Sequence, residues 1–324
     1  MPKVSKKDLE NRPKEKYKLK NWSTYNKSLV QRGDFTIWMG DDFEQSWCYS
    51  GANKPGGTVT YSDTAIEFCL IIRHLYNLTY RATEGFVNAL FRVQGIELDV
   101  PSYSQVQKRS GKIEVDIRVR KSKKNQGINV VIDSTGLKVF GEGEWKMRKH
   151  GKTKRRTWRK VHMASDGEDL EILAVSLTSN SVDDAEAGIE LIEEIKDNKE
   201  KIKSVSGDGA YDKVKFRGCL DKQIDQRIPP QHNAVDSEGK VGAYHQRDEQ
   251  VKAIAKMGRS EWKKEIDYHI RSKSEVNMYR YKKIFSGELK ARKEKFEENE
   301  IKIKCKILNK FVGIGMPDSY KVAS

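Results

Sequence analysis

The first clear periodicity of apolar residues is helical and begins at Ser62. From there, apolar side chains recur at steps of three and four residues, the spacing of one helix face: Ala65, Ile66, Cys69, Leu70, Ile72 and Leu75. A second helical run covers residues 82–93, and a third begins after Pro101 with Ser102 as its expected N-cap. The pattern therefore predicts three short helices between residues 62 and 112.

The third helix ends in a basic stretch that includes Lys108 and Arg109. Three short helices with a basic last one are typical of a helix-turn-helix module, which lays that helix in a DNA groove. A plain helical bundle with a basic surface fits the same pattern, because short basic helices are common. Our interpretation is a helix-turn-helix-like region over about 62–112, with Lys108 and Arg109 as candidate DNA contacts.

Beyond the helices, Ile113, Val115, Ile117 and Val119 alternate with charged residues and predict a strand that leads into the basic linker "RKSKKNQG". The pattern then changes to strand-like runs at 128–133, 156–165 and 170–178, a helix at 183–195, and further strands near 202–208 and 225–230 with helices after each. This order predicts an α/β fold with a mixed sheet, and it suggests a ribonuclease-H-like layout.

The change of pattern places a domain boundary near residue 125. We expect a mainly helical region over residues 1–125, whose lysine-rich first 20 residues stay mobile, an α/β domain over 126–300, and a C-terminal tail over 301–324.

Charge changes the picture, because 62 Lys and Arg against 47 Asp and Glu leave a formal net charge of +15. Such an excess favours a polyanionic partner, although lysine-rich surfaces also occur on proteins that bind no nucleic acid. The four cysteines are scattered and form no zinc-binding or disulfide framework. With neither a signal peptide nor a membrane-spanning apolar run, we expect a cytoplasmic, nucleoid-associated bacterial protein with no membrane partner.

Two aspartates stand where predicted strands end: Asp133 follows "NVVI" and Asp208 follows "KSVSG". Side chains at such strand ends converge in open α/β sheets, where ligands bind. Each aspartate taken alone is more typical of a turn than of a ligand site.

A later segment, "YHIRSKSEVNMYRYKK", spaces four polar residues by three, four and seven: Tyr268, Arg271, Glu275 and Lys282. On one helix these offsets fall within an arc of roughly 60°. One face then carries a carboxylate with two cations and a phenol. A solvated face with an Arg271–Glu275 ion pair is the alternative interpretation.

The spacing Y-x2-R-x3-E-x6-K resembles the signature of the DDE transposases of bacterial insertion sequences, and the segments around Asp133 and Asp208 resemble those of insertion sequence family five. The resemblance covers roughly residues 60–320. It implies a ribonuclease-H-like catalytic domain in which Asp133, Asp208 and Glu275 hold two Mg²⁺ ions, with Mn²⁺ able to substitute. It also implies that Tyr268, Arg271 and Lys282 contact phosphates near the element end.

The expected chemistry explains the residue types. Two metal ions roughly 3.5–4 Å apart activate water and stabilise the leaving 3′ oxygen, and hard Mg²⁺ prefers carboxylate oxygens to Cys or His. The basic run over residues 146–160 adds candidate DNA contacts beside the site: Arg155, Arg156, Trp158 and Arg159. A solvated hairpin is the alternative for that run.

The resemblance implies a DNA transposase that binds the terminal inverted repeats of an insertion sequence and catalyses metal-dependent cleavage and strand transfer. The expected partners are terminal-repeat DNA, target DNA and further copies of the chain, as a homodimer or higher assembly on DNA. A decayed or repurposed DNA-binding protein and a nuclease without strand transfer are the alternatives.

Overall fold

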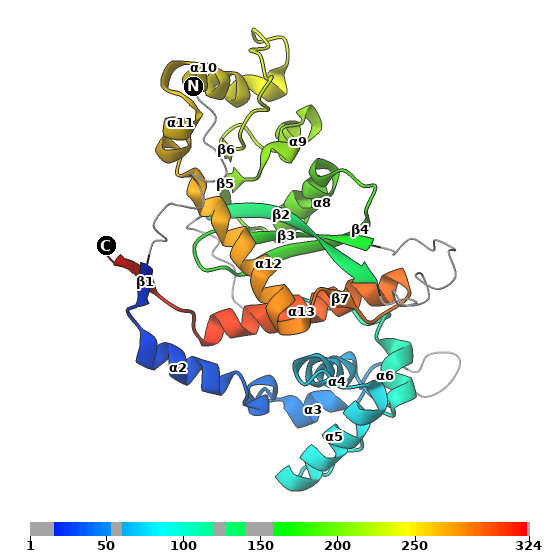
Figure 1. The fold of residues 1–324 in the computed structure, drawn as a ribbon. Helices are drawn as coiled ribbons and strands as arrows, with labels where there is room; N and C mark the ends of the chain where they lie inside the picture. Colours follow the sequence, from blue (N-terminus) through cyan, green and yellow to red (C-terminus); the bar gives the residue numbers. More distant parts are fainter. Residues whose placement is uncertain (1–15, 53–59, 119–126, 140–157, 323–324) are drawn as a thin grey trace, which may run out of the picture.

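The computed structural model describes residues 16–52, 60–118, 127–139 and 158–322. The described part begins with elements that are mostly helical: β1 (Lys16–Leu19), α2 (Trp22–Gln31), η1 (Phe35–Trp38), α3 (Phe43–Trp47), α4 (Asp63–Leu75), α5 (Tyr80–Gln94) and α6 (Tyr103–Arg109). These helices lie together below the sheet in Figure 1. The three helices predicted between residues 62 and 112 are confirmed as α4, α5 and α6.

Local sequence explains where these three helices begin. The hydroxyl of Ser62 accepts a hydrogen bond from Ala65 N, and that of Thr79 accepts one from Ala82 N. Ser102 and Gln105 form a reciprocal capping box at the start of α6. Capping satisfies backbone N–H groups that have no partner within the helix.

A mixed sheet forms the centre of the second half, in the order β4-β3-β2-β5-β6, with β7 paired to the far end of β2. Its strands are β2 (Ile128–Val139), β3 (Trp158–Asp166), β4 (Ile172–Ser179), β5 (Ile202–Ser206), β6 (Asp225–Arg227) and β7 (Glu288–Leu289). Strands β2, β3 and β4 are antiparallel, whereas β5, β6 and β7 join in parallel. The predicted α/β class with a mixed sheet is confirmed.

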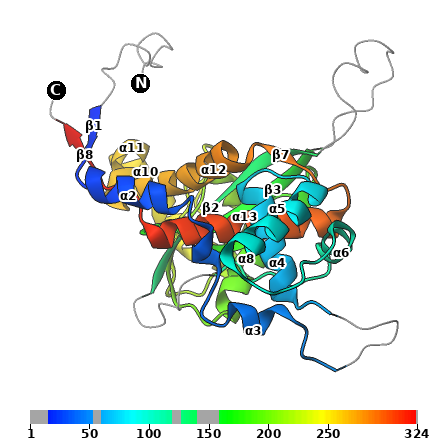
Figure 2. The ribbon, with the colours of Figure 1, turned by 90° about the horizontal axis from the view of Figure 1, so that it is seen from below.

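Helices cover both faces of this sheet (Figures 1 and 2). The helices of this half are α8 (Asp184–Asp197), α9 (Val214–Cys219), α10 (His245–Met257), α11 (Arg259–Glu265), α12 (Ser272–Phe285) and α13 (Glu294–Ile314), with short turns η2 (Gly209–Tyr211), η3 (Gly242–Tyr244) and η4 (Tyr268–Arg271). Helices α10 and α11 lie beyond the β6 edge of the sheet in Figure 1. Helices α8 and α9 pack on one face, and α12 and α13 pack on the other. Each face thus has its own apolar core.

Helix α13 corrects the expected tail at residues 301–324. Its apolar residues Ile301, Ile303, Ile307, Leu308 and Phe311 are buried, and they join the sheet to α4 in one core. In "IKIKCKIL" lysines alternate with apolar residues and obscure the helical period, but Lys304 is itself buried in an ion pair with Glu300. Because one core spans both halves, residue 125 does not divide the apolar interior.

The strand expected over residues 113–119 is also wrong for its described part, since 113–118 belong to no strand. Ile113, Val115 and Ile117 are buried as the alternation predicts. Side-chain amides of α13 take the place of a neighbouring strand: Asn299 donates to Ile113 O at 2.8 Å, and Asn309 donates to Ile117 O at 2.8 Å. These amides satisfy buried backbone carbonyls.

Strand β1 pairs antiparallel with β8 (Ser319–Val322), which joins residues near the two ends of the described chain. The Asn21 side chain fastens this pairing, donating to Met316 O and accepting from Asp318 N. Residues 16–19 therefore do not belong to a mobile segment, and residues 1–15 lie outside the described part.

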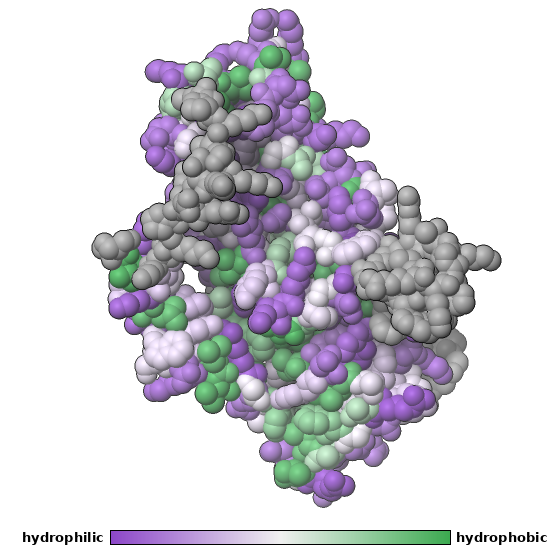
Figure 3. Space-filling model, viewed as in Figure 1, coloured by the Kyte–Doolittle hydropathy of each residue, from purple (hydrophilic) through white to green (hydrophobic). Residues whose placement is uncertain are grey.

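The outer side of α5 carries exposed apolar residues, among them Phe86 and Val93. Hydrophobic colour gathers over this helix at the lower end of the surface in Figure 3. No described helix combines the length and the apolar character that crossing a bilayer requires.

Candidate active site

Asp133 and Asp208 occupy equivalent positions on two neighbouring strands. Val131 of β2 pairs with Ser206 of β5 in parallel, and each aspartate follows its paired residue by two positions. Adjacent strands run about 4.8 Å apart, so this register brings the two carboxylates to one place at the edge of the β2–β5 pairing. The expected convergence of the two aspartates is therefore supported by the register.

The structure corrects one detail of this expectation, because Asp133 does not begin a turn. Strand β2 continues through Asp133 to Val139, where it pairs with β3 and β7, and only its pairing with β5 stops before Asp133. Asp208 does leave its strand, and its carboxylate caps η2 by accepting from Ala210 N at 2.8 Å.

Asp133 is a half-buried carboxylate with two hydrogen-bond donors. Its Oδ1 accepts from Ser134 N at 2.9 Å, and its Oδ2 accepts from the Ser274 hydroxyl at 3.2 Å. Burial raises the pKa of Asp133 above its ordinary value, the charge of Asp208 raises it further, and the hydrogen bonds and Arg271 lower it only in part. Negative charge is therefore unfavourable at this point unless a cation accompanies it.

This pKa shift predicts the stability of Asp133→Asn. A carboxylate whose pKa is raised by folding destabilises the native state when ionised, above its folded pKa, and has no such effect below its unfolded pKa. The variant should be more stable than the wild type at neutral pH without metal, and the difference should vanish as pH falls toward about 4. Thermal unfolding in chelator across this range measures it, and a less stable variant at neutral pH would contradict the shift.

The segment from Tyr268 to Lys282 lies against both aspartates. Tyr268 OH donates to Gly207 O, next to Asp208, at 3.2 Å, and Arg271 Nε donates to Tyr268 OH at 3.2 Å. At the far end, Lys282 Nζ donates to Thr135 Oγ1 on β2. Tyr268 and Arg271 lie on the 3₁₀ turn η4 and not on α12, so the prediction of one helix from Tyr268 to Lys282 is wrong at its start. The contacts with Gly207 and Thr135 nevertheless place Tyr268 and Lys282 along the side of β2 and β5 that carries the two aspartates.

Glu275 stands in the first turn of α12, directly after Ser274. Arg271 Nη1 donates to Glu275 Oε1 at 2.9 Å, and the Glu275 side chain is 63% exposed. The ion pair expected under the alternative interpretation is therefore present. In this arrangement, no three acidic, His or Cys side chains of the described ranges are close enough to hold a metal ion together.

A buried ion cluster holds the loop that carries Asp208. Asp212 accepts from Arg217 Nε at 2.8 Å, from Arg247 Nε at 3.0 Å and from Gln231 N at 2.9 Å. Arg217 also donates to Ile228 O after β6. One buried carboxylate thus ties the Asp208 loop to α9, α10 and the end of β6.

Asp212→Asn should destabilise the protein by about 3–5 kcal/mol, because it leaves the buried guanidinium of Arg217 without its counter-charge and leaves Arg247 only the weaker pair with Asp248 at 3.8 Å. Asp225→Asn is the matched control, since its partner Arg227 forms an ion pair with a half-exposed carboxylate, and such pairs contribute about 0–1 kcal/mol. Denaturant unfolding of both variants measures the difference, and equal losses would contradict the role given to Asp212.

The other expected DNA contacts have different surroundings. Lys108 is exposed, but Arg109 donates to Tyr61 O and forms an ion pair with Asp63 within the helical region. Arg159 pairs with Glu294 and Glu297 of α13. The guanidinium groups of Arg109 and Arg159 thus hold the fold together, while Arg155 and Arg156 lie outside the described residues.

Trp158 is 39% exposed and lies over Gly136 of β2. A Cβ atom at Gly136 would stand 3.3 Å from the indole, so a glycine there lets the ring approach the strand that carries Asp133.

Two residues near the aspartates were not predicted. Ser274 donates to Asp133, and its only signal in the sequence is its place before Glu275. Tyr211 is buried, its hydroxyl has no hydrogen-bond partner among the described residues, and burial together with nearby Asp184, Asp133 and Asp208 raises its pKa well above the ordinary value. Its position in "GDGAYD" was the available signal.

Comparison with known families gives two matches. A family model described as Transposase DDE domain matches residues 124–309, which contain both aspartates, Glu275 and all strands of the mixed sheet. A second model with the same description matches residues 30–142, which contain the helices α4–α6 and the whole of β2.

Proposed function

Because the chain belongs to the family of transposases with a DDE domain, we propose that it binds the terminal inverted repeats of an insertion sequence and that Asp133, Asp208 and Glu275 cut and rejoin DNA there. The observation that carries this assignment is the parallel register of β2 and β5, which sets Asp133 and Asp208 side by side. Helix α12 supports it further, because Ser274 contacts Asp133 immediately before Glu275.

Transposases of this family use divalent metals, and the residues present fit such an ion. Asp133 and Asp208 concentrate negative charge in a half-buried place where ionisation is unfavourable, and a cation would relieve this repulsion. We assign Mg²⁺, with Mn²⁺ as a substitute, to Asp133, Asp208 and Glu275, because hard divalent ions prefer carboxylate oxygens. Two bound ions would activate a nucleophile and stabilise the charge of a leaving 3′ oxygen.

Glu275 and Arg271 form an ion pair in the free protein. When DNA is present, Arg271 has a phosphate as a stronger partner, and Glu275 has a metal ion. A guanidinium forms bidentate hydrogen bonds with phosphate, so a DNA phosphate draws Arg271 away from Glu275. The released carboxylate then faces the pair of aspartates. The Arg271–Glu275 ion pair thus holds the third carboxylate aside until a phosphate arrives.

The remaining DNA contacts follow the same side of the molecule. Tyr268 holds Arg271 beside the Asp208 loop, and Lys282 lies over Thr135, two residues beyond Asp133. Trp158 presents part of its indole next to this strand for stacking on a base. The helical region of residues 62–112, with Lys108 on α6, is assigned to recognition of the repeats, in a homodimer or higher assembly that holds two ends.

Arg271→Ala and Lys282→Ala should each weaken binding of the element end and lower the salt slope of binding by about one unit, because each removes one phosphate contact. Metal affinity should change little in Lys282→Ala and should rise without DNA in Arg271→Ala, because Glu275 loses its ion-pair partner. Cleavage should slow in both variants because the DNA is less well positioned. Lys283→Ala is the matched control, since this exposed lysine is adjacent in sequence but points away from the arc. The affinity for the element end is measured as a function of salt concentration. If both variants keep the wild-type affinity and salt slope, Arg271 and Lys282 do not contact phosphate, and Arg271 only forms a surface ion pair with Glu275.

Strand transfer with a pre-cleaved terminal-repeat end tests the proposed function directly. Joining of the 3′ hydroxyl to a target duplex, dependent on divalent metal, is the expected result. Cleavage of an intact end without joining would indicate a nuclease, and end binding without either reaction would indicate a DNA-binding protein that has lost catalysis.

A further inference from the structure

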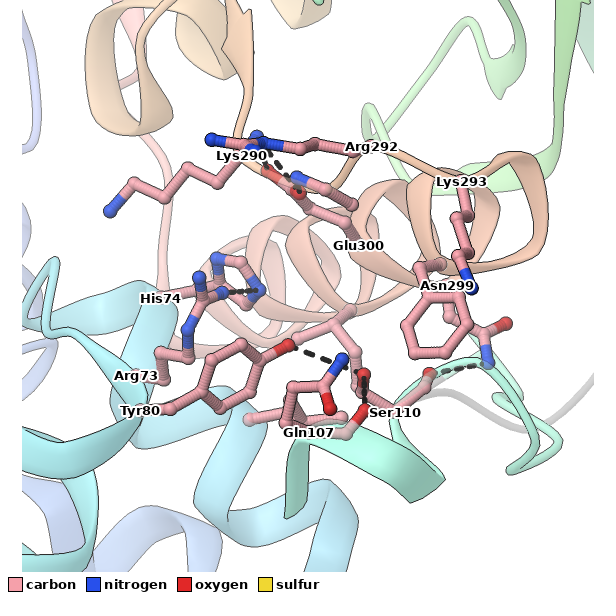
Figure 4. Close-up of a pocket in the computed structure, with 14 residues that line it drawn as sticks. Arg73, His74, Tyr80, Gln107, Ser110, Lys290, Arg292, Lys293, Asn299 and Glu300 are labelled. Carbon is pink, nitrogen blue, oxygen red and sulfur yellow. Dashed lines mark hydrogen bonds between the residues drawn. The ribbon is translucent and has the colours of Figure 1, made fainter. Parts of the chain in front are cut away.

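A pocket of about 310 Å³ lies between the helical region and α13, on a different part of the molecule from the carboxylates. Figure 4 shows Arg73, His74, Tyr80, Gln107 and Ser110 facing the side chains of the segment 290–300 across it. The first group comes from α4, α5 and the end of α6, and the second from the link between β7 and α13 and from the first turns of α13. None of the residues that line this pocket belongs to the candidate active site.

The pocket is lined by an excess of positive charge. Arg73, Lys290, Arg292 and Lys293 line it together with one carboxylate, Glu300. That carboxylate already accepts hydrogen bonds from Lys304 Nζ at 2.6 Å and from the backbone N–H groups of Lys290 and Ala291. Among the described residues, Glu300 forms its ion pair with Lys304 and none with Arg73 or Lys290.

Arg73 is the most telling of these cations, because it is only 7% exposed. Its guanidinium stacks 4.2 Å from the Tyr80 ring centre and donates to His74 Nε2 at 3.1 Å. Its Nε has no hydrogen-bond partner in the described part of the chain, and no carboxylate there pairs with it. A buried charge without a counter-charge is costly, so such a group normally has an anionic partner.

The surroundings of His74 confirm that the positive charge is concentrated here. Burial lowers the pKa of His74 well below its ordinary value, and Lys304, Arg73 and Lys290 lower it further. A neutral imidazole accepts the proton that Arg73 donates, which orients the guanidinium beside the pocket. Burial and the charges of Arg73 and Lys304 likewise lower the pKa of Lys290.

We propose that this pocket binds a nucleoside phosphate, with the base against the apolar wall and the phosphate on Arg73 and on Lys290, whose Nζ donates to Asn77 Oδ1 in the free protein. Guanidinium groups match the oxygens of phosphate in pairs. The volume is at the lower end for small-molecule sites and exceeds what inorganic phosphate alone requires. Leu70, Phe296 and Ile303 supply the apolar wall, and the amide of Gln107 is placed to meet polar atoms of a base.

The ligand has two possible sources with the same chemistry: a free nucleotide, or the 5′-phosphorylated end of a DNA strand. In either case the bound group would join the helical region to α13, because the pocket wall comes from both. Ligand that binds only the native state raises the unfolding temperature. The inference does not rest on the catalytic assignment, and its test uses no cleavage reaction.

Thermal unfolding of the full chain tests the proposal, with dAMP, deoxyadenosine and inorganic phosphate added at equal ionic strength set by chloride. We expect dAMP to raise the unfolding temperature more than phosphate does, and deoxyadenosine to leave it unchanged. A short single strand with a 5′ phosphate, compared with the same strand ending in a 5′ hydroxyl, identifies DNA ends as the source if only the phosphorylated strand adds stability. If none of these ligands exceeds the chloride control, the proposal is overturned.

Variants assign the effect to the pocket. Arg73→Met should weaken dAMP binding at least tenfold while leaving the ligand-free protein as stable as the wild type or more so, since it removes an unpaired buried charge. Lys290→Met, at an exposed position, should also weaken dAMP binding. This variant replaces Arg73→Met in the test if Arg73→Met does not fold. Lys302→Met removes a cation from the far side of α13 and should bind normally. If Lys302→Met weakens dAMP binding as much as Arg73→Met does, the binding depends only on the overall positive charge of the protein, and the proposed site is wrong.

Discussion

Asp133→Asn, Asp208→Asn and Glu275→Gln are each expected to reduce metal-dependent cleavage of the terminal repeats at least about 10³-fold. Each change removes the charge of one proposed metal ligand and little volume. The bound metal contributes several kcal/mol to transition-state stabilisation, and about 4 kcal/mol corresponds to three powers of ten in rate. Binding of the element end should stay nearly normal, because the phosphate contacts remain.

Cleavage is measured on a labelled repeat under single-turnover conditions, beside end binding of the same preparation. Glu186→Gln, an exposed change at the first turn of α8, is the control for loss of a carboxylate elsewhere and should cleave normally. If any one of the three variants retains full activity, that residue does not belong to the catalytic set. Loss of both cleavage and end binding would indicate a folding defect instead.

A chain that ends at Glu300 is expected to lose its stable fold. The deletion removes Ile301, Ile303, Ile307, Leu308 and Phe311, which are buried between the sheet and α4. Loss of each large buried side chain costs about 2–5 kcal/mol, and domains are typically stable by only about 5–15 kcal/mol in total. Circular dichroism should show no cooperative thermal transition, and the helical region should be lost together with the sheet.

A chain that ends at Asp318 separates α13 from the residues beyond it. It keeps α13 and the contacts of Asn21 with Met316 and Asp318, and it loses only β8. This chain should unfold cooperatively close to the wild-type temperature. Cooperative unfolding of the shorter chain would mean that residues 301–314 are dispensable, as a tail would be.

The site could be predicted from the sequence where its signal is local. Asp133 and Asp208 each follow a short run of strand-forming residues in the sequence, and Glu275 lies at fixed spacings from Arg271 and Lys282. The register that sets Val131 opposite Ser206 has no local signal, because it depends on strands more than seventy residues apart. The pairing of Arg271 with Glu275 follows from i,i+4 spacing, whereas the competition with metal and phosphate that we propose for it is argued from the surrounding contacts.

The parts of the fold that were predicted wrongly owe their state to distant side chains. Alternation at Ile113, Val115 and Ile117 resembles a strand, and only the amides of Asn299 and Asn309 show why this segment needs no strand partner. Lys304 likewise makes the sequence of α13 look polar, but this lysine is buried because its charge is paired with that of Glu300. Propensity and periodicity describe neighbours along the chain, and these contacts join residues that are far apart.

The pairing of β1 with β8 has a consequence for how the chain folds. Residues 16–19 find their partners at 319–322, and α4 finds α13 more than two hundred residues later. Contacts of such long sequence separation form slowly, because loop closure must precede them. During synthesis, the apolar surface of the helical region therefore stays uncovered until α13 has left the ribosome. The β1–β8 pairing and the packing of α4 on α13 therefore form late in folding.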